Sequence, residues 1–369
     1  MSHQEGLGSS ARARIYDITG LQVQHLLAKL DVLLEYLPFP LPLEEILSPG
    51  DFTQGEASGG KHTFQEASIL GHLRRIGVIG NDLTTTARKR AIELGAGTGR
   101  LSDRLSRVTQ ASLDHILIDR QEFSEAQTRD RILRARAKSR NHNPCPMIER
   151  IVLDIASLDL DDYLLDDDRS CFCMSKHLCG PACDLAIASL GRLKCNRLPV
   201  CAVATCCHYL CTWESFSGKD FWISLGLSED DFLVAVSASQ WASLKSAKKM
   251  NQDVPVNTSC LLYHSQTHLG QLSEAAETAA SALHASDNGI ARVITPSEEF
   301  EKSFSREEKV ALGITLKQIL DLARAARLQE MGYDVRLVRY TTRSLEDRLL
   351  VATPKTESRI KRKACGSET

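Results

Sequence analysis

The chain has 369 residues, enough for one large domain or two smaller ones. Hydrophobic residues make up 43% of the chain and charged residues 25%, a balance that excludes disorder throughout. The net charge of −2 excludes a uniformly basic nucleic-acid-binding protein, although not a local basic patch, because binding depends on how the charge is distributed.

The N-terminus and the cysteines indicate where the protein works. The N-terminus has no apolar signal core and no apolar run is long enough to cross a bilayer, so we expect an intracellular protein without membrane attachment, in the cytoplasm, the nucleus or both. None of the 12 cysteines precedes Cys145, and nine lie from Cys171 to Cys211 in apolar sequence. This placement favours buried thiols or a reactive site in a reducing compartment.

Residues 1–62 are expected to form an N-terminal helical and linker segment. An amphipathic helical pattern over residues 21–47 is broken by Pro38, Pro40 and Pro42, and residues 48–62 are rich in turn formers. The helical pattern resumes at Phe64, near the start of the main domain, which we predict over residues 63–353.

Strand and helix signals then alternate along the chain. Short, continuously apolar strands, typical of a parallel sheet buried on both faces, are predicted at residues 91–94, 116–119, 151–154, 171–174 and 200–205. Helices are predicted between them, for example at residues 123–139 and 181–193. This alternation predicts an α/β fold with a doubly wound, mostly parallel sheet.

The C-terminal part is predicted to complete the sheet. A long amphipathic helix at residues 307–331 precedes two strands, at residues 333–340 and 348–352, which form an antiparallel hairpin at the far edge. Residues 268–290 are rich in Ala and Ser and are expected to be a surface insertion, part helix and part disorder. Residues 354–369 form a basic tail, for which a solvated segment is favoured over a nucleic-acid-binding one.

The most informative local motif is a glycine loop, ELGAGTGRLS, at residues 93–102. It lies between a predicted strand and a predicted helix, where an α/β sheet holds a nucleotide-like ligand. Gly95, Gly97 and Gly99 have the spacing G-x-G-x-G rather than the G-x-G-x-x-G of dinucleotide sites. The spacing therefore favours S-adenosylmethionine over NAD as the cofactor.

Acidic residues accompany the first three predicted strands. Asp119 follows Gly99 by about 20 residues, the separation expected for a carboxylate that accepts the ribose hydroxyls. We expect Asp154 to meet the adenine amino group and Glu93 to face the methionine ammonium. The alternative is a tight turn without a ligand, and the three acids in order favour the cofactor site.

Two further boxes follow the fourth and fifth predicted strands: SKHLCGPACDL at residues 175–185 and ATCCHYLCTW at residues 204–213. Because neighbouring parallel strands end at one edge of a sheet, both boxes are expected beside the cofactor. His177 and His208 are candidate general bases near neutral pH, and Lys176 is a candidate base or a cation that orients the substrate. A structural role is the alternative for each of the three.

Three roles compete for the cysteine-rich box: a substrate-positioning wall, a zinc site, and a packed thiol cluster with a hydrogen-bonded histidine. Zinc is disfavoured because adjacent Cys206 and Cys207 need an irregular backbone to reach one tetrahedral ion, so no metal is predicted. A cysteine nucleophile at Cys179 or Cys207 ranks low.

At these boxes the sequence resembles the eukaryotic tRNA 2′-O-methyltransferases that modify the fourth nucleotide of the acceptor stem. The similarity covers roughly residues 60–353 and is carried by QEASILGHL (65–73), ELGAGTGRLS (93–102), LIDRQ (117–121), KHLCGPACDLAI (176–187), CCHYLCTW (206–213) and QWASL (240–244). The resemblance implies a class I methyltransferase-like Rossmann fold, S-adenosylmethionine as cofactor and the tRNA acceptor stem as substrate.

The chain departs from the family pattern at several positions. Thr98 stands where the usual G-A-G-K-G has its lysine, and Tyr209 replaces the second histidine of the usual C-C-H-H. Family members usually carry small Cys/His zinc modules before the catalytic domain, whereas no cysteine precedes Cys145 here. We therefore do not expect those modules in this chain.

A basic helical segment offers a candidate RNA-binding surface. Among its cations, Arg131, Arg134 and Lys138 are the residues predicted to contact phosphates of a stem that is recognised by shape. A solvated, cation-rich helix is the alternative.

The sequence thus predicts an S-adenosylmethionine-dependent tRNA 2′-O-methyltransferase. The alternatives are a related methyltransferase acting on another RNA or a protein, and a non-catalytic RNA-binding homologue. No protein partner can be deduced.

Overall fold

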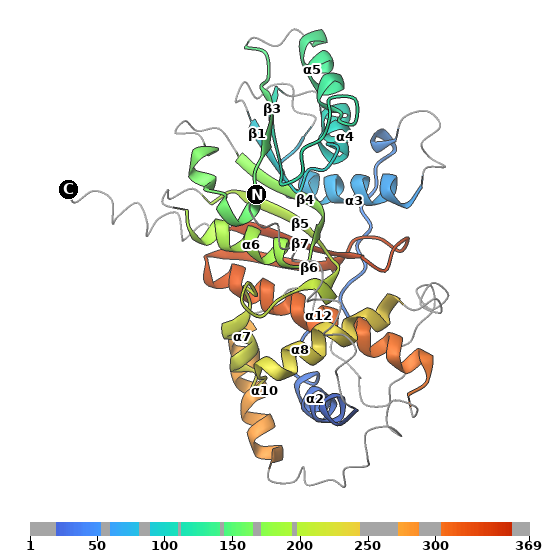
Figure 1. Cartoon of the computed structure of the whole chain (residues 1–369), viewed down its shortest axis with the longest axis vertical. Helices are drawn as coiled ribbons and strands as arrows, with labels where there is room; N and C mark the ends of the chain where they lie inside the picture. The colour runs from blue at the N-terminus through green and yellow to red at the C-terminus, as the bar shows by residue number, and fades with distance from the viewer. Residues whose placement is uncertain are drawn as a thin grey trace, which may run out of the picture. The chain divides into compact units, whose positions relative to one another are not determined.

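The computed structural model describes residues 20–52, 60–80, 89–109, 112–140, 144–164, 171–193, 198–243, 272–287 and 304–355. Its contacts divide the chain into two compact units, and Figure 1 labels most of their helices and strands. The sheet unit comprises Leu43–Cys206 and Leu328–Thr369, and the helical unit comprises Met1–Pro42 and Cys207–Arg327. The domain boundaries expected from composition stay predictions, and the basic tail from residue 356 onward lies outside the described residues.

The sheet unit contains one seven-stranded sheet with the order β3-β2-β1-β4-β5-β7-β6. Its strands are β1 (Lys89–Leu94), β2 (Leu113–Asp119), β3 (Ile148–Val152), β4 (Cys171–Cys179), β5 (Val200–Cys206), β6 (Tyr333–Arg339) and β7 (Arg348–Pro354). Strands β1 to β5 pair in parallel, and β7 is antiparallel to both β5 and β6. The predicted α/β fold, mostly parallel with an antiparallel C-terminal hairpin, is confirmed.

The sheet is covered on both faces by helices (Figure 1). The helices of this unit are α3 (Lys61–Arg75), α4 (Arg100–Val108), α5 (Asp130–Ser139) and α6 (Pro181–Gly191), with short 3-10 helices η2 (Pro49–Asp51), η4 (Ile155–Ser157) and η5 (Leu160–Asp162). Phe172 and Met174 of β4 join one apolar cluster with Leu70 of α3, whereas Cys173 between them faces Ile187 of α6. This alternation of side chains along a buried strand is what makes the predicted strands continuously apolar.

The strand order places a switch point between β1 and β4. Chain connections run from β1 outward through β2 and β3 and then return across to β4 and β5. Open α/β sheets bind ligands at such a point, outside the carboxyl ends of the strands. The glycine loop follows β1, and the lysine-histidine box lies at the end of β4, so both reach this point.

Three elements differ in extent from the sequence prediction. Strand β4 continues to Cys179 rather than stopping at Met174, so it includes the lysine-histidine box. Strand β3 ends at Val152, which leaves Asp154 just beyond it as the N-cap of η4. Helix α5 begins at Asp130 because the preceding residues, predicted as its first turns, form turns and bends instead.

The helical unit is built from α2 (Gly20–Leu33), α7 (Lys219–Ser224), α8 (Glu229–Ala238), α10 (Leu272–Asp287) and α12 (Arg306–Glu330), with 3-10 helices η6 (His208–Leu210) and η7 (Ser239–Ser243). The last three residues of α12 belong to the sheet unit. Aromatic rings form part of its core, with the Phe216 and Phe232 centroids 4.7 Å apart and Trp222 edge-on to both. The predicted C-terminal helix is confirmed.

The described part of the expected insertion packs against other helices of the helical unit rather than lying on the surface. Residues 272–287 form α10, which contacts α2 and α7 and buries Leu272, Ala276, Ala279 and Leu283. These four positions recur at helical spacing, so α10 has an apolar face. Two of the four residues are alanines, so the face is hard to recognise in the sequence. The flanking residues 268–271 and 288–290 lie outside the described part of the chain.

Among the described residues, the structure contains no helix with the length and apolarity that a bilayer crossing requires.

Candidate active site at the switch point

The glycine loop turns sharply between β1 and α4. Gly95, Gly97 and Gly99 all have positive φ, at 66°, 51° and 80°, a region that strains residues with a side chain. A Cβ on Gly95 would lie 2.9 Å from Leu178 Cδ1, whereas a Cβ on Gly97 would meet nothing within 4 Å. The loop therefore packs on β4 at its start and leaves open space at its middle glycine.

Asp119, the last residue of β2, holds the middle of this loop. Its Oδ2 atom accepts a hydrogen bond from the Gly97 N–H at 2.7 Å, and its Oδ1 atom accepts one from the Gln121 N–H at 2.9 Å. The structure thus brings Asp119 and Gly97 together. Because each carboxylate oxygen has more than one lone pair, Asp119 retains acceptor capacity, and its role towards the ribose hydroxyls stays a prediction.

A second support of the loop was not predicted from the sequence. Arg150 of β3 places Nε 2.7 Å and Nη2 2.9 Å from the two carboxylate oxygens of Asp130, and its Nη1 donates to the Gly97 carbonyl at 2.8 Å. The exposed fractions of the two side chains are only 11% and 7%. The sequence shows only that Arg150 directly precedes a predicted strand, beside Glu149, and a half-buried charge in a sheet needs a partner.

Glu93 is buried at the end of β1 rather than open to a ligand. Its Oε2 atom accepts a hydrogen bond from the Ser102 N–H at 3.0 Å, which satisfies one of the free donors in the first turn of α4. Burial raises the pKa of the Glu93 carboxyl to about 7. The predicted contact with the methionine ammonium stays a prediction.

Asp154 lies just beyond β3 and is exposed. Its Oδ1 atom accepts a hydrogen bond from the Ala156 N–H at 2.9 Å and so caps the start of η4. This cap fixes the carboxylate at the carboxyl end of β3, and the predicted contact with adenine stays a prediction.

The lysine-histidine box sits on a bulge of β4. The register between β4 and β5 shifts between Ser175 and Leu178, and His177 has a φ of 63°. Bulges of this kind redirect side chains and are frequent beside active sites. The irregular backbone places Lys176 and His177 outside the regular alternation of the strand, close to the glycine loop that packs on Leu178.

Lys176 is held by residues of helix α3. Its Nζ atom lies 3.2 Å from Glu66 Oε1 and 3.2 Å from His62 Nδ1, and its side chain is 10% exposed. Burial is the main reason that the pKa of Lys176 is lowered, against the opposing effect of Glu66. Glu66 is itself buried and also pairs with Arg100 and Arg104 of α4.

His177 has an unused ring nitrogen. Its Nε2 atom is buried and has no hydrogen-bond partner among the described residues. Its ring stands edge-on to that of His62, with centroids 5.5 Å apart and an interplanar angle of 88°. Burial lowers the pKa of His177 to about 4, so the imidazole is neutral at physiological pH and able to accept a proton.

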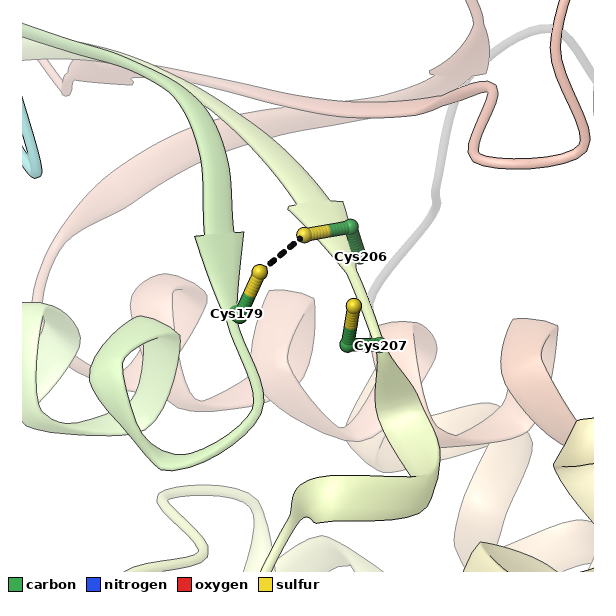
Figure 2. A group of neighbouring side chains, drawn as sticks. All are labelled: Cys179, Cys206 and Cys207. Atoms are coloured by element: carbon green, nitrogen blue, oxygen red, sulfur yellow. Dashed lines mark hydrogen bonds between the residues drawn. The ribbon is translucent and has the colours of Figure 1, made fainter. Parts of the chain in front are cut away.

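The ends of β4 and β5 carry paired thiols. Cys179 and Cys206 are register partners, and their sulfur atoms lie 3.0 Å apart. Figure 2 shows the two sulfur atoms pointing toward each other. Cys206 is buried, Cys179 is exposed, and Cys207 follows Cys206 in the chain. Facing thiols suit a packed thiol cluster and a metal site alike, so the three roles proposed for this box stay predictions.

His208 lies in the helical unit, with no exposed surface. Its Nε2 atom is 2.9 Å from Asp321 Oδ2, and Asp321 also pairs with Arg324, which donates to Cys211 Sγ at 3.0 Å. Burial lowers the pKa of His208. His208 and Cys211 thus contact α12, and the role of His208 as a base stays a prediction.

Helix α5 presents part of its charge to solvent. Arg131, Arg134 and Lys138 are exposed at spacings of three and four residues, so they share one face. Arg136 instead turns inward to Asp103 of α4, at 2.9 Å, and Arg140 donates to the Thr109 carbonyl at 2.7 Å. The three residues predicted to bind RNA are therefore exposed, with Arg134 also lying 4.0 Å from Glu125, whereas Arg136 and Arg140 bind neighbouring parts of the protein.

Comparison with known proteins identifies the family. The family model described as "Methyltransferase TRM13" matches residues 64–353, which include the glycine loop, both boxes and the C-terminal hairpin. The chain belongs to this methyltransferase family.

Curated relatives carry the same family name. The "tRNA:m(4)X modification enzyme TRM13" of Schizosaccharomyces pombe is 28% identical, over 80% of this chain and 69% of the relative. The homologue from Homo sapiens is 26% identical, over 80% of this chain and 65% of the relative. The homologue from Dictyostelium discoideum is 29% identical, over 52% of this chain and 36% of the relative. The chain thus spans between about a third and two thirds of the length of these relatives.

Proposed function

We propose that the chain transfers a methyl group from S-adenosylmethionine to the ribose 2′-hydroxyl of the fourth nucleotide of the tRNA acceptor stem. One observation carries this proposal: the open glycine loop of β1 and the Lys176–His177 bulge of β4 belong to directly paired strands. A methyl donor at the first and a proton acceptor at the second are the two requirements of the reaction. Residues 63–353 are proposed to form the catalytic domain.

The residues present fit an adenosyl cofactor. Around Gly97 the loop leaves space that a Cβ would not fill, which is the room a ligand needs to approach the backbone. Asp119 lies beside this space with acceptor capacity that suits a ribose diol. In the proposal these residues hold the adenosine half, with Asp154 near the base and Glu93 towards the methionine ammonium. When bound, S-adenosylmethionine supplies an electrophilic methyl group on a sulfonium.

In the proposal, Lys176 and His177 between them accept the proton of the ribose hydroxyl and orient its oxygen. Neutral His177 presents a buried nitrogen without a partner among the residues that the structure describes, and Lys176 is held between Glu66 and His62. As an amine, Lys176 is suited to accept the hydroxyl proton as the oxygen gains the methyl group, and as an ammonium it stabilises negative charge on the oxygen. His177, whose pKa of about 4 makes it the weaker base, is suited to accept a hydrogen bond that orients the hydroxyl.

The substrate is proposed to be engaged through its phosphates. The exposed face of α5 that carries Arg131, Arg134 and Lys138 offers three cations with the spacing of one helix side. Such contacts position a duplex stem without reading its sequence. The relatives' names, which specify modification of tRNA, support tRNA as the substrate.

Incubation of the purified protein with methyl-labelled S-adenosylmethionine and total tRNA tests the proposal. The expected result is a labelled 2′-O-methyl nucleotide at the fourth position of the acceptor stem. Label in another RNA or in a protein supports the first alternative, a related methyltransferase with another substrate. Cofactor binding without transfer to any of these supports a non-catalytic RNA-binding homologue.

A further inference from the structure

Helix α3 adds a residue to the site that the glycine loop and the β4 bulge form. His62 lies in the first turn of α3, and its Nδ1 atom is 3.2 Å from Lys176 Nζ. Its ring is partly exposed, whereas Lys176 is mostly buried. A buried amine is thus connected by one hydrogen bond to an imidazole that reaches solvent.

We propose that His62 and Lys176 act as one proton-accepting pair, in which His62 relays to solvent the proton that Lys176 takes from the ribose hydroxyl. The inference rests on the methyl-transfer function proposed above. In this arrangement Lys176 touches the substrate and His62 acts through Lys176, so His62 is a positioning and relay residue.

The polarity of the contact supports a relay. A lysine ammonium has three donors and no lone pair, so Nδ1 of His62 must accept whenever Lys176 is charged. Glu66 occupies a second position around Nζ at 3.2 Å. The amine therefore has one carboxylate and one imidazole as neighbours, and its remaining bonding position is free to face a ligand in a tetrahedral arrangement.

Burial and nearby positive charges lower the pKa of both imidazoles, His62 and His177. Lys176, Lys61 and Arg100 lower the pKa of His62 along with burial, which is the largest cause. After burial, which is the largest cause, Lys176, His62 and Lys61 also lower the pKa of His177, whereas Glu346 raises it. The pKa of Lys176 is lowered mainly by burial and further by Arg100, whereas Glu66 and Glu93 raise it. Because the pKa values of the imidazoles are lowered, a proton that arrives on His62 passes on to water readily instead of staying there.

The step balances without another reactant. The ribose oxygen forms a bond to the methyl carbon, the bond between that carbon and the sulfur breaks, and the sulfur keeps the electron pair. Lys176 is charged at rest, and the reactive form is the one in which it has given a proton to His62, which passes it to water. Its amine then takes the hydroxyl proton and becomes an ammonium. A proton of that ammonium then goes to His62 Nδ1, and the imidazolium loses a proton to water.

A kinetic experiment with His62→Gln tests the relay, with the exposed His25 of α2 replaced in the same way as control. We expect His62→Gln to lower kcat by about tenfold to a hundredfold, within the range that one proton-transfer group contributes. The KM values for tRNA and cofactor should change less than about threefold, because His62 does not touch either substrate. The rise of kcat with pH should move to higher pH because Lys176 must then release its proton to water unaided. An unchanged kcat and pH profile would overturn the relay.

A second measurement is independent of turnover. Histidine NMR titration of the cofactor-free protein should give His62 a pKa below its ordinary value, and Lys176→Met should raise that pKa because a neighbouring positive charge is removed. If the wild-type protein methylates no tRNA, the proposed function fails, while the titration still decides whether the pair exists. A His62 pKa that does not respond to Lys176→Met refutes the pair even in an active enzyme.

Discussion

Replacing Arg150 with methionine removes the ion pair and the hydrogen bond that support the glycine loop. Removing one partner of a buried ion pair costs about 3–5 kcal/mol because the other charge is left without a partner. The two side chains retain 11% and 7% exposure, so water relieves part of that cost and we expect about 3 kcal/mol. Loss of the donor to the Gly97 carbonyl adds about 1 kcal/mol.

Urea unfolding followed by circular dichroism measures the loss of stability, and calorimetry with S-adenosylmethionine measures its effect on the site. Cofactor affinity should fall by about tenfold, equal to about 1.4 kcal/mol, because the loop must be ordered on binding. The exposed Arg134→Met on α5 is the matched control and should change stability by less than about 0.5 kcal/mol.

A double-mutant cycle of Arg150→Met with Asp130→Asn separates the interaction between the two side chains from unrelated losses of stability. When both partners are replaced, no unpaired charge remains, so the double variant should lose clearly less stability than the sum of the two single losses. Strict additivity of the two effects would refute the view that Arg150 and Asp130 support the loop as a unit.

Three other sets of variants test the cofactor loop and the basic helix. Asp119→Ala should weaken cofactor binding by about 1–3 kcal/mol in calorimetry, since hydroxyl partners are left unpaired; unchanged affinity contradicts the assignment. The raised pKa of Glu93, about 7 against an ordinary 4.5, stabilises the fold fully below pH 4.5 and loses that contribution as pH rises towards 7. Between about pH 5 and 7.5 the wild type should therefore lose more stability in urea than Glu93→Gln, and equal losses would show that Glu93 does not titrate there. Replacing Arg131, Arg134 and Lys138 together with Gln should weaken tRNA binding and reduce its salt dependence, by about 0.7–0.9 in log–log slope for each phosphate that is no longer neutralised. An unchanged slope removes α5 from the interface.

The sheet was predictable from the sequence because its signals are local. Short apolar segments locate the five parallel strands, although β3 is Ile148–Val152, contains Glu149 and Arg150, and shares only two residues with the predicted strand. The C-terminal hairpin follows from its two apolar segments joined by a polar turn. The apolar face of α10 was also present in the sequence, at positions 272, 276, 279 and 283, but alanine and serine made it resemble a surface segment.

The supports of the site depend instead on contacts between distant segments. Nothing in the sequence around His62 indicates that it meets Lys176, and nothing near Arg150 indicates that it meets Asp130 and Gly97. The bulge at His177 is likewise a property of two strands paired together, because only the register with β5 shows the shift. Sequence patterns therefore located the residues of the site, whereas the packing determined their partners.

The position of β7 has a consequence for the making of the protein. Strand β7 lies between β5 and β6. Its Ala352 pairs with Cys201 of β5, which precedes it by about 150 residues in the chain. Until the final segment leaves the ribosome, β5 has an unpaired edge that is prone to wrong association. A chain truncated before Arg348 would retain every residue proposed for the site and still lack the strand that joins β6 to β5.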